Sequence, residues 1–320
     1  MKVLVTGGTG FVGRRVVELL VEAGHAVRRS LRRPAVPLPG VQDTVVGELD
    51  GLTRWTETDL EVDVVIHLAA RAHVIRETAV DPHRAFQDVN VRGTQALASA
   101  AARARVSRFV LVSSAGVYGF AEADAPHFDE TSPVAPHTPY ATSKWLAEQA
   151  LQKVSADTGL PAVSIRPPLV YGPGNGGNML RLLELIDRNL PLPLGSVRNR
   201  RSLIYVDNLA SAIIACTLRA GTLSPLYVVR DGHDLSTPEL IAGLSRCFTP
   251  PRREPWPFPE ALLRGMASVL GLRRSAEAML ASLRVRDDLI HSELGWLPPV
   301  SVEIGLSNTV NWFQTRGKPR

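Results

Sequence analysis

Residues 1–13 read MKVLVTGGTGFVG, and this stretch decides the predicted fold. Lys2–Thr6 is a short apolar run rich in β-branched side chains, as is typical of a strand buried in a parallel sheet. A glycine-rich turn, Gly7–Gly13, follows directly, and the next residues keep the apolar pattern of a helix as far as Gly24. This order predicts a dinucleotide site, because the free N–H groups at a helix start bind phosphates.

The spaced glycines of this turn have different predicted roles. Gly7 permits a tight turn, Gly10 lets the backbone approach a pyrophosphate, and Gly13 lets the helix pack close to the strand. Their spacing is G-x-x-G-x-x-G rather than the G-x-G-x-x-G of many dehydrogenases. The strand before the turn and the helix after it make the signal much stronger than three glycines alone.

The composition is that of a chain with a large buried core. Its 320 residues are 45% hydrophobic and carry a net charge of +5, and this length forms one or two domains. Cys216 and Cys247 are too few for a disulfide framework or a metal cluster, so we expect packed thiols, no metal and a reducing, cytoplasmic location. We expect no signal peptide, because the first predicted strand begins at residue 2.

Two surface features could indicate other partners. No apolar run reaches the roughly 18 residues of a membrane span, and we expect Leu262–Leu272 to pack on the core rather than contact a membrane. Arginines cluster at positions 28, 29, 32 and 33, but no nucleic-acid recognition motif accompanies them. This cluster therefore favours an anionic cofactor over a nucleic acid.

A second motif, YATSK, spans Tyr140–Lys144 and places a phenol and an amine on one face of a predicted helix. Moving a hydride to or from a carbon that bears oxygen also requires a proton to move on that oxygen. A phenol with its usual pKa of about 10 is a poor base at neutral pH, but a nearby ammonium group lowers that pKa. We therefore predict that Tyr140 is the acid/base and that Lys144 supports it.

Six stretches, in one order along the chain, make the sequence resemble the extended short-chain dehydrogenase/reductase family. The resemblance is closer to its sugar-nucleotide epimerases, dehydratases and 4-ketoreductases. It implies an α/β fold, with a Rossmann-type doubly wound parallel sheet in residues 1–167. A smaller mixed sugar-nucleotide region is implied for residues 168–320, with some chain returning to the first domain. The stretches are TGGTGFVG at Thr6–Gly13, HLAA at His67–Ala70, NVRGT at Asn90–Thr94, VSSAGVYG at Val112–Gly119, YATSK at Tyr140–Lys144 and RPPLVYGPG at Arg166–Gly174.

The resemblance also implies the site residues. It gives a catalytic set of Ser114, Tyr140 and Lys144, with Ser113 as a less favoured substitute for Ser114. The implied cofactor contacts are Gly7, Thr9, Gly10, Phe11, Val12, Gly13, Arg29, Arg32, Arg33, Glu48, Leu49, Leu68, Ala69, Ala70, Asn90, Tyr140, Lys144 and Pro167. The implied substrate contacts are His73, Ser114, Ala115, Gly116, Asn178 and Arg201.

The choice of cofactor depends on the end of the second predicted strand, His25–Arg29. Members of the family that prefer NAD carry an acid there for the ribose hydroxyls, whereas residues 28–33 contain four arginines and no acid. Arginine binds a phosphate through two parallel hydrogen bonds, so we expect NADP(H), with NAD(H) as the alternative. Arg32, and then Arg29 or Arg33, are the expected contacts to the 2′-phosphate.

Three functions stay open at this point. The resemblance is closest to bacterial reductases of UDP-4-keto-6-deoxy-N-acetylglucosamine, in O-antigen, capsule and other lipopolysaccharide biosynthesis, notably along Pro191–Val206. A UDP-sugar 4-epimerase is the alternative, because Ala115 and Gly116 match the epimerases. A dinucleotide sensor without catalysis is the third. A 4,6-dehydratase is excluded, because alanine and glycine replace the Asp-Glu pair of the dehydratases.

The family also implies a UDP-sugar substrate and a homodimer formed through the predicted helices Arg84–Arg103 and Tyr140–Ser155.

Overall fold

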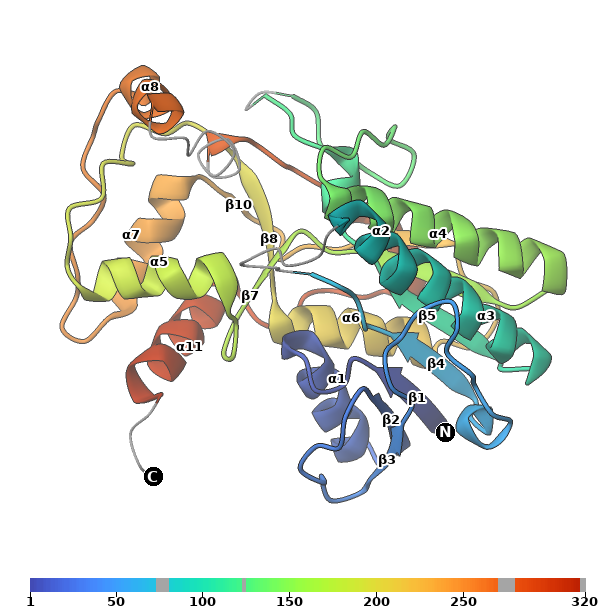
Figure 1. Cartoon of the computed structure of the whole chain (residues 1–320). Coiled ribbons are helices and arrows are strands. Elements are labelled where there is room, and N and C mark those ends of the chain that lie inside the picture. The colour runs from blue at the N-terminus through green and yellow to red at the C-terminus, as the bar shows by residue number, and fades with distance from the viewer. Residues whose placement is uncertain (73–80, 123–124, 270–279, 317–320) are drawn as a thin grey trace.

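The computed structural model describes residues 1–72, 81–122, 125–269 and 280–316. Within them, the largest element is a seven-stranded parallel sheet with the strand order β3-β2-β1-β4-β5-β6-β9 (Figure 1). The order reverses between β1 and β4, as in a doubly wound dinucleotide-binding sheet, which confirms the predicted fold class. The strands are β1 Lys2–Thr6, β2 Ala26–Leu31, β3 Val41–Val45, β4 Val64–His67, β5 Arg108–Val112, β6 Ala162–Arg166 and β9 Leu226–Val228.

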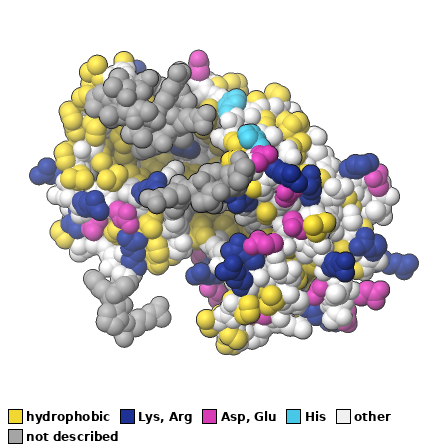
Figure 2. Space-filling view, viewed as in Figure 1, with side chains coloured by type: hydrophobic (Ala, Val, Ile, Leu, Met, Phe, Trp, Pro, Cys, Tyr) yellow, Lys and Arg dark blue, Asp and Glu magenta, His cyan; other side chains and the backbone are white. Residues whose placement is uncertain are grey.

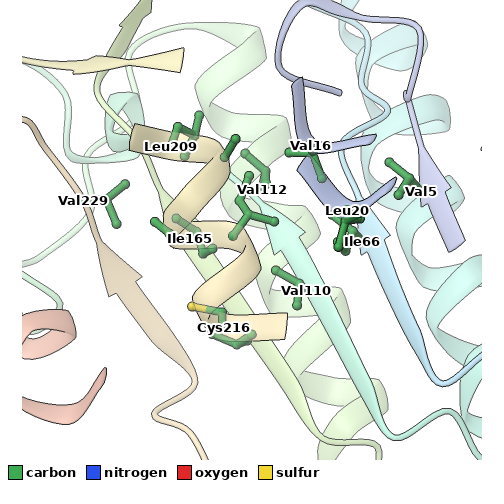
Figure 3. Close-up of a cluster of buried hydrophobic side chains, with 14 of the residues drawn as sticks. Val5, Val16, Leu20, Ile66, Val110, Val112, Ile165, Leu209, Cys216 and Val229 are labelled. Carbon is green, nitrogen blue, oxygen red and sulfur yellow. The ribbon is translucent and has the colours of Figure 1, made fainter. Parts of the chain in front are cut away.

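Helices cover both faces of this sheet (Figure 1). Successive strand residues point to opposite faces, so Val3 and Val5 join one core while Leu4 joins the other. The helices α1 (Phe11–Glu22) and α6 (Val206–Leu218) pack in the first core, part of which Figure 3 draws. The other core contains α3 and α4. The helices that follow β4 and β5 are α2 Pro82–Phe86, the π-helical turn Gln87–Arg92, α3 Gly93–Arg103 and α4 Pro139–Thr158.

The C-terminal region has its own core around a three-stranded sheet ordered β10-β8-β7. Part of this half of the chain returns to the large sheet, because β9 pairs with β6 and α6 packs against β5. The elements of this region are β7 Leu169–Tyr171, α5 Gly177–Asp187, β8 Arg201–Tyr205, β10 Asp234–Leu235, α7 Thr237–Cys247, α8 Glu260–Val269, α10 Asp288–Leu294 and α11 Val302–Thr315.

The third strand differs from the sequence-based expectation. Residues 45–49, V-V-G-E-L, predict the third strand and the turn after it; the strand β3 is Val41–Val45, and Gly47, with φ of +79°, lies in the loop that follows. β3 is the edge strand and is only partly buried, so its sequence VQDTV lacks a continuous apolar run. The strand expected at His25–Arg29 is also displaced, since β2 is Ala26–Leu31.

The glycine turn joins β1 to α1 through very close backbone contacts. A methyl group added to Gly13 would lie 2.1 Å from the carbonyl oxygen of Gly7. Gly7 has a φ of +70°, and a Cβ there would lie 2.7 Å from the backbone nitrogen of Ala69. A side chain at either position therefore collides with backbone atoms that cannot rotate away.

We predict that Gly13→Ala lowers the free energy of unfolding by about 1–3 kcal/mol, the usual scale for overpacking. Urea unfolding followed by circular dichroism measures this change. Gly265→Ala is the matched control, because, outside its own helix backbone, no atom of the described residues lies within 4 Å of the methyl group added on α8. Its stability should stay the same or rise slightly, as alanine favours helix. Equal stability of the Gly13 variant and wild type would contradict the close-packing argument.

Candidate active site

The phosphate-binding end of the site is the first turn of α1. Gly10 is the N-cap residue, and the backbone N–H groups of the first helical residues have no partner within the helix. No acidic residue lies in this turn, so nothing there repels an anion. The turn therefore fits the diphosphate of a dinucleotide, with Phe11, Val12 and Gly13 as the donors that the sequence predicted.

Arg29 is not placed as expected. Its side chain is only 3% exposed, and its Nε and Nη2 each donate to Asp43 at 2.8 Å. It also lies under the glycine turn, because a Cβ on Gly8 would be 3.0 Å from its Cδ. These contacts do not fit the expected role of Arg29 at a 2′-phosphate, since the donors are already bound to a carboxylate.

The other two candidate arginines follow the end of β2. Leu31 is buried at the last position of β2, where NAD-preferring relatives of this fold carry an acid. Arg32 and Arg33 come next and are exposed, and Arg32 lies 3.5 Å from Glu48 in a solvent-exposed ion pair. Such a pair is weak, so the Arg32 guanidinium can exchange its partner for a phosphate.

A network of buried hydrogen bonds holds the loop that follows β4. The Oγ1 atom of Thr6 accepts a hydrogen bond from the backbone N–H of Ala69 at 3.2 Å. Asn90 accepts from the N–H of Arg71 at 2.7 Å and donates to its carbonyl at 3.1 Å. Asn90 thus holds the backbone of this loop, and Leu68 and Ala69 lie beside the glycine turn.

His67 is part of this network and does not act as a base. Its Nδ1 lies 2.6 Å from Thr6 Oγ1, and its Nε2 lies 3.1 Å from Thr94 Oγ1. Burial, and then the charge of Lys144, lower its pKa to about 3. The imidazole is therefore neutral at physiological pH and has a structural role.

Tyr140 and Lys144 lie one turn apart on α4. Thr138 caps this helix by accepting from the N–H of Ala141 at 3.1 Å, which fixes the turn that carries Tyr140. The Tyr140 ring packs edge-on against Phe86, with ring centroids 6.4 Å apart. Asn90 donates to Ser143 at 2.8 Å, and Ser143 donates to the Tyr140 carbonyl at 2.7 Å. The catalytic helix is therefore hydrogen-bonded to the loop after β4.

Burial controls the protonation of this pair. It raises the pKa of Tyr140 to about 12, so the expected lowering by Lys144 is not found among the protein's own groups. Burial also lowers the pKa of Lys144 to about 8, and the charge of Glu148 partly opposes this. At neutral pH, Tyr140 is thus a phenol and Lys144 is mainly an ammonium ion.

Ser114 is held beside this helix. It is the N-cap of the 3-10 turn Ala115–Tyr118, and its Oγ accepts from the N–H of Gly116 at 3.1 Å. A Cβ on Gly116 would lie 3.8 Å from the Cβ of Ala141, so the serine loop packs against the first turn of α4. The N–H of Ala115 donates to the Pro167 carbonyl at 2.8 Å, which brings the predicted contact Pro167 to the same place. Ser113 Oγ is buried and finds no hydrogen-bond partner among the described residues.

The predicted substrate contacts Asn178 and Arg201 lie on two different elements of the C-terminal region. Asn178 is exposed in the first turn of α5, and Arg201 begins β8, where burial lowers its pKa. Both belong to the C-terminal region, and Figure 2 shows the surface hollowed between this region and the large sheet. His73 lies outside the described residues.

A buried ion pair between Arg166 and Glu148 lies one helical turn after Lys144, and the sequence did not predict it. Arg166 joins β6 to α4, because its Nη2 lies 2.6 Å from Glu148 Oε2. Its guanidinium also lies over the Tyr118 ring, 4.8 Å from the centroid. Glu148 was not predicted. Its position four residues after Lys144, on the same helix face, was the available signal.

Two other kinds of site are not found in the described part of the chain. No cluster of three or more metal-ligating side chains occurs there. None of the helices described is both long enough and apolar enough to cross a membrane.

The burial of Lys144 predicts a pH-dependent stability. Between about pH 8 and pH 10 the unfolded chain keeps a lysine proton that the native state has released. The free energy of unfolding therefore gains up to about 1.4 kcal/mol per pH unit from this group as pH rises. Urea unfolding of wild type and Lys144→Met across this range should give a stability difference that grows with pH. Lys153→Met, exposed on the same helix, is the control, and its difference should be flat.

Comparison with known proteins agrees with this geometry. The profile of the NAD dependent epimerase/dehydratase family matches residues 3–225. A UDP-glucose 4-epimerase of Vibrio cholerae is 32% identical over 97% of this chain and 95% of its own length. An N-acetyl-alpha-D-glucosaminyl-diphospho-ditrans,octacis-undecaprenol 4-epimerase of Escherichia coli O157:H7 is 26% identical over 97% of this chain and 94% of its own.

The search of solved structures also finds a similar UDP-sugar epimerase. The Thermus thermophilus UDP-glucose 4-epimerase in complex with NAD has a TM-score of 0.78 and 26% identity, covering 99% of this chain and all of that one. The fold, the glycine turn and the Tyr140–Lys144 pair thus occur together with a family match over more than half the chain. The chain belongs to the NAD dependent epimerase/dehydratase family of sugar-nucleotide enzymes, which use a nicotinamide dinucleotide.

Proposed function

We propose that the protein is an NADP(H)-dependent reductase that converts the 4-keto group of a UDP-activated 6-deoxy-hexosamine to a hydroxyl group. The observation that carries this proposal is the end of β2, where Leu31 is buried and two exposed arginines follow it. A reductase takes up fresh reduced cofactor in each cycle, and NADPH is the usual cellular reductant. The resemblance of Pro191–Val206 to 4-ketoreductases supports the same substrate class.

The protonation of Tyr140 suits a reduction. The reduced nicotinamide supplies the hydride to C4 when it is bound. Tyr140, whose pKa of about 12 keeps it a phenol, donates the proton to the oxygen on C4. The product is a hydroxyl group and the oxidised cofactor, so atoms and charge balance. Lys144 then stabilises the phenolate that remains until it regains a proton from water.

Ser114 orients the reacting oxygen in this mechanism. Its Oγ accepts a hydrogen bond from the N–H of Gly116, which leaves its own proton free to donate to the keto oxygen. Ala115 and Gly116 have no group that can transfer a proton. A dehydratase needs two such groups to remove water across C5 and C6, and this argues against dehydration.

A 4-epimerase is the second candidate. The Vibrio cholerae relative, 32% identical over nearly the whole chain, is named a UDP-glucose 4-epimerase. The small side chains of Ala115 and Gly116 also leave room for a keto sugar to turn and present its other face. An epimerase retains its cofactor and consumes none, so the two candidates differ in a quantity that can be measured.

The reductase should oxidise one NADPH for each 4-keto sugar consumed. The test supplies UDP-4-keto-6-deoxy-N-acetylglucosamine with NADPH, follows absorbance, and identifies the product by NMR. Tyr140→Phe should lose at least ~100-fold in turnover, because it removes the proton donor and keeps the ring. Interconversion of UDP-N-acetylglucosamine and UDP-N-acetylgalactosamine with no net cofactor use would instead establish the epimerase. Cofactor binding without any turnover would indicate a sensor.

The cofactor preference is tested separately by calorimetry. We expect NADPH to bind roughly 10- to 100-fold more tightly than NADH, the effect of a charged contact to the 2′-phosphate. Arg32→Gln with Arg33→Gln should remove this preference and leave NADH affinity unchanged. Arg103→Gln, exposed at the end of α3, is the control. Equal affinities of the wild type for the two cofactors would refute the assignment.

A further inference from the structure

An exposed group of large apolar side chains lies on the C-terminal region, away from the catalytic residues. Trp256 is 44% exposed, Leu262 is 56% exposed and Leu190 is 45% exposed. Phe258 packs edge-on against Trp256, with ring centroids 5.4 Å apart. We call these four residues the aromatic patch. Single exposed leucines are common on proteins, but a tryptophan, a phenylalanine and two leucines together are not.

Backbone hydrogen bonds keep the loop of Leu190 and the segment of Trp256 side by side, and Leu262 follows that segment in the first turn of α8. The Trp256 N–H donates to the Leu192 carbonyl at 3.0 Å, and the Gly195 N–H donates to the Trp256 carbonyl at 2.9 Å. The backbones pack so closely that a Cβ on Gly195 would lie 2.7 Å from the carbonyl carbon of Trp256. The loop that carries Leu190 and the segment that carries Trp256 thus form one surface. Figure 2 shows apolar side chains gathered at the upper left, where Figure 1 places α8.

The surroundings of the patch are positively charged. Arg188 and Arg253 are exposed, and the N–H of Arg253 donates to Asn189 at 2.9 Å, next to Leu190. Among the described residues, no acidic side chain pairs with either arginine. The acids close to them in sequence are neutralised, since Asp187 pairs with Arg252 at 2.8 Å and Glu254 with Arg246 at 3.3 Å. Glu260, between Phe258 and Leu262 in the sequence, is not free of partners either, so the uncompensated charge of Arg188 and Arg253 is positive.

We propose that the aromatic patch and its two arginines are a docking surface for a membrane that contains anionic lipids. Tryptophan favours the boundary between headgroups and acyl chains, where its apolar ring and its polar N–H are both accommodated, and phenylalanine and leucine supply further apolar area that can be buried there. Unpaired arginines next to such a patch bind anionic headgroups. This proposal differs from the expectation that Leu262–Leu272 packs on the core, a segment of which residues 270–272 lie outside the described residues. It does not depend on the proposed reaction.

Vesicle binding by the full-length protein tests the proposal. Sedimentation with vesicles of phosphatidylcholine containing about one third phosphatidylglycerol should bind the protein, and pure phosphatidylcholine should not. Trp256→Ser with Leu262→Ser should weaken binding at least tenfold. Arg188→Gln with Arg253→Gln should weaken it roughly fivefold per arginine and reduce its salt dependence.

Matched controls replace residues of the same kind that are also exposed elsewhere on the molecule. Leu52→Ser with Leu297→Ser, and Arg103→Gln with Arg219→Gln, should bind the vesicles as wild type does. Equal binding to both vesicle types, or patch variants that bind like wild type, would overturn the proposal. Light scattering adds a further check. If the patch variants lose self-association and wild type binds no vesicles, the surface is a contact between copies of this chain.

Discussion

A chain of buried hydrogen bonds connects the glycine turn to the catalytic helix, and the geometry of the site depends on it. It runs from Thr6 through the His67 ring to Thr94, whose hydroxyl donates to the Asn90 carbonyl at 2.6 Å. The Asn90 side chain continues it to Ser143 and so to the backbone of Tyr140. Because these groups are buried, leaving one unpaired costs about 1–3 kcal/mol, which favours a single arrangement of the site.

Burial also sets the protonation states of the ionisable side chains in and beside this network. Removal from water keeps His67 neutral, keeps Tyr140 protonated and brings the pKa of Lys144 close to neutral pH. Glu148, itself bound by Arg166, is the acid that favours the charged form of Lys144. A proton donor and a cation therefore lie one helical turn apart in a site whose histidine takes no part in proton transfer.

The register of the third strand explains why Arg29 is buried and paired while Arg32 and Arg33 are exposed. From the sequence, residues 45–49 were predicted to hold the end of this strand and the turn after it. The strand is Val41–Val45, and this register puts Asp43 directly opposite Arg29 on β2. Arg29, which the local sequence predicted to contact a phosphate, is thus buried and paired with Asp43. Arg32 and Arg33 escape this pairing because they lie beyond the end of β2.

The sequence by itself determined what depends on residues close together in the chain. The strand, glycine turn and helix at residues 2–22, and the shared helix face of Tyr140 and Lys144, follow from short-range spacing and backbone geometry. Only the tertiary structure decided which distant groups meet. The pairing of Arg29 with Asp43 and of Glu148 with Arg166 results from strand register and helix packing. Contacts and burial of this kind set each group's charge, and no local pattern encodes them.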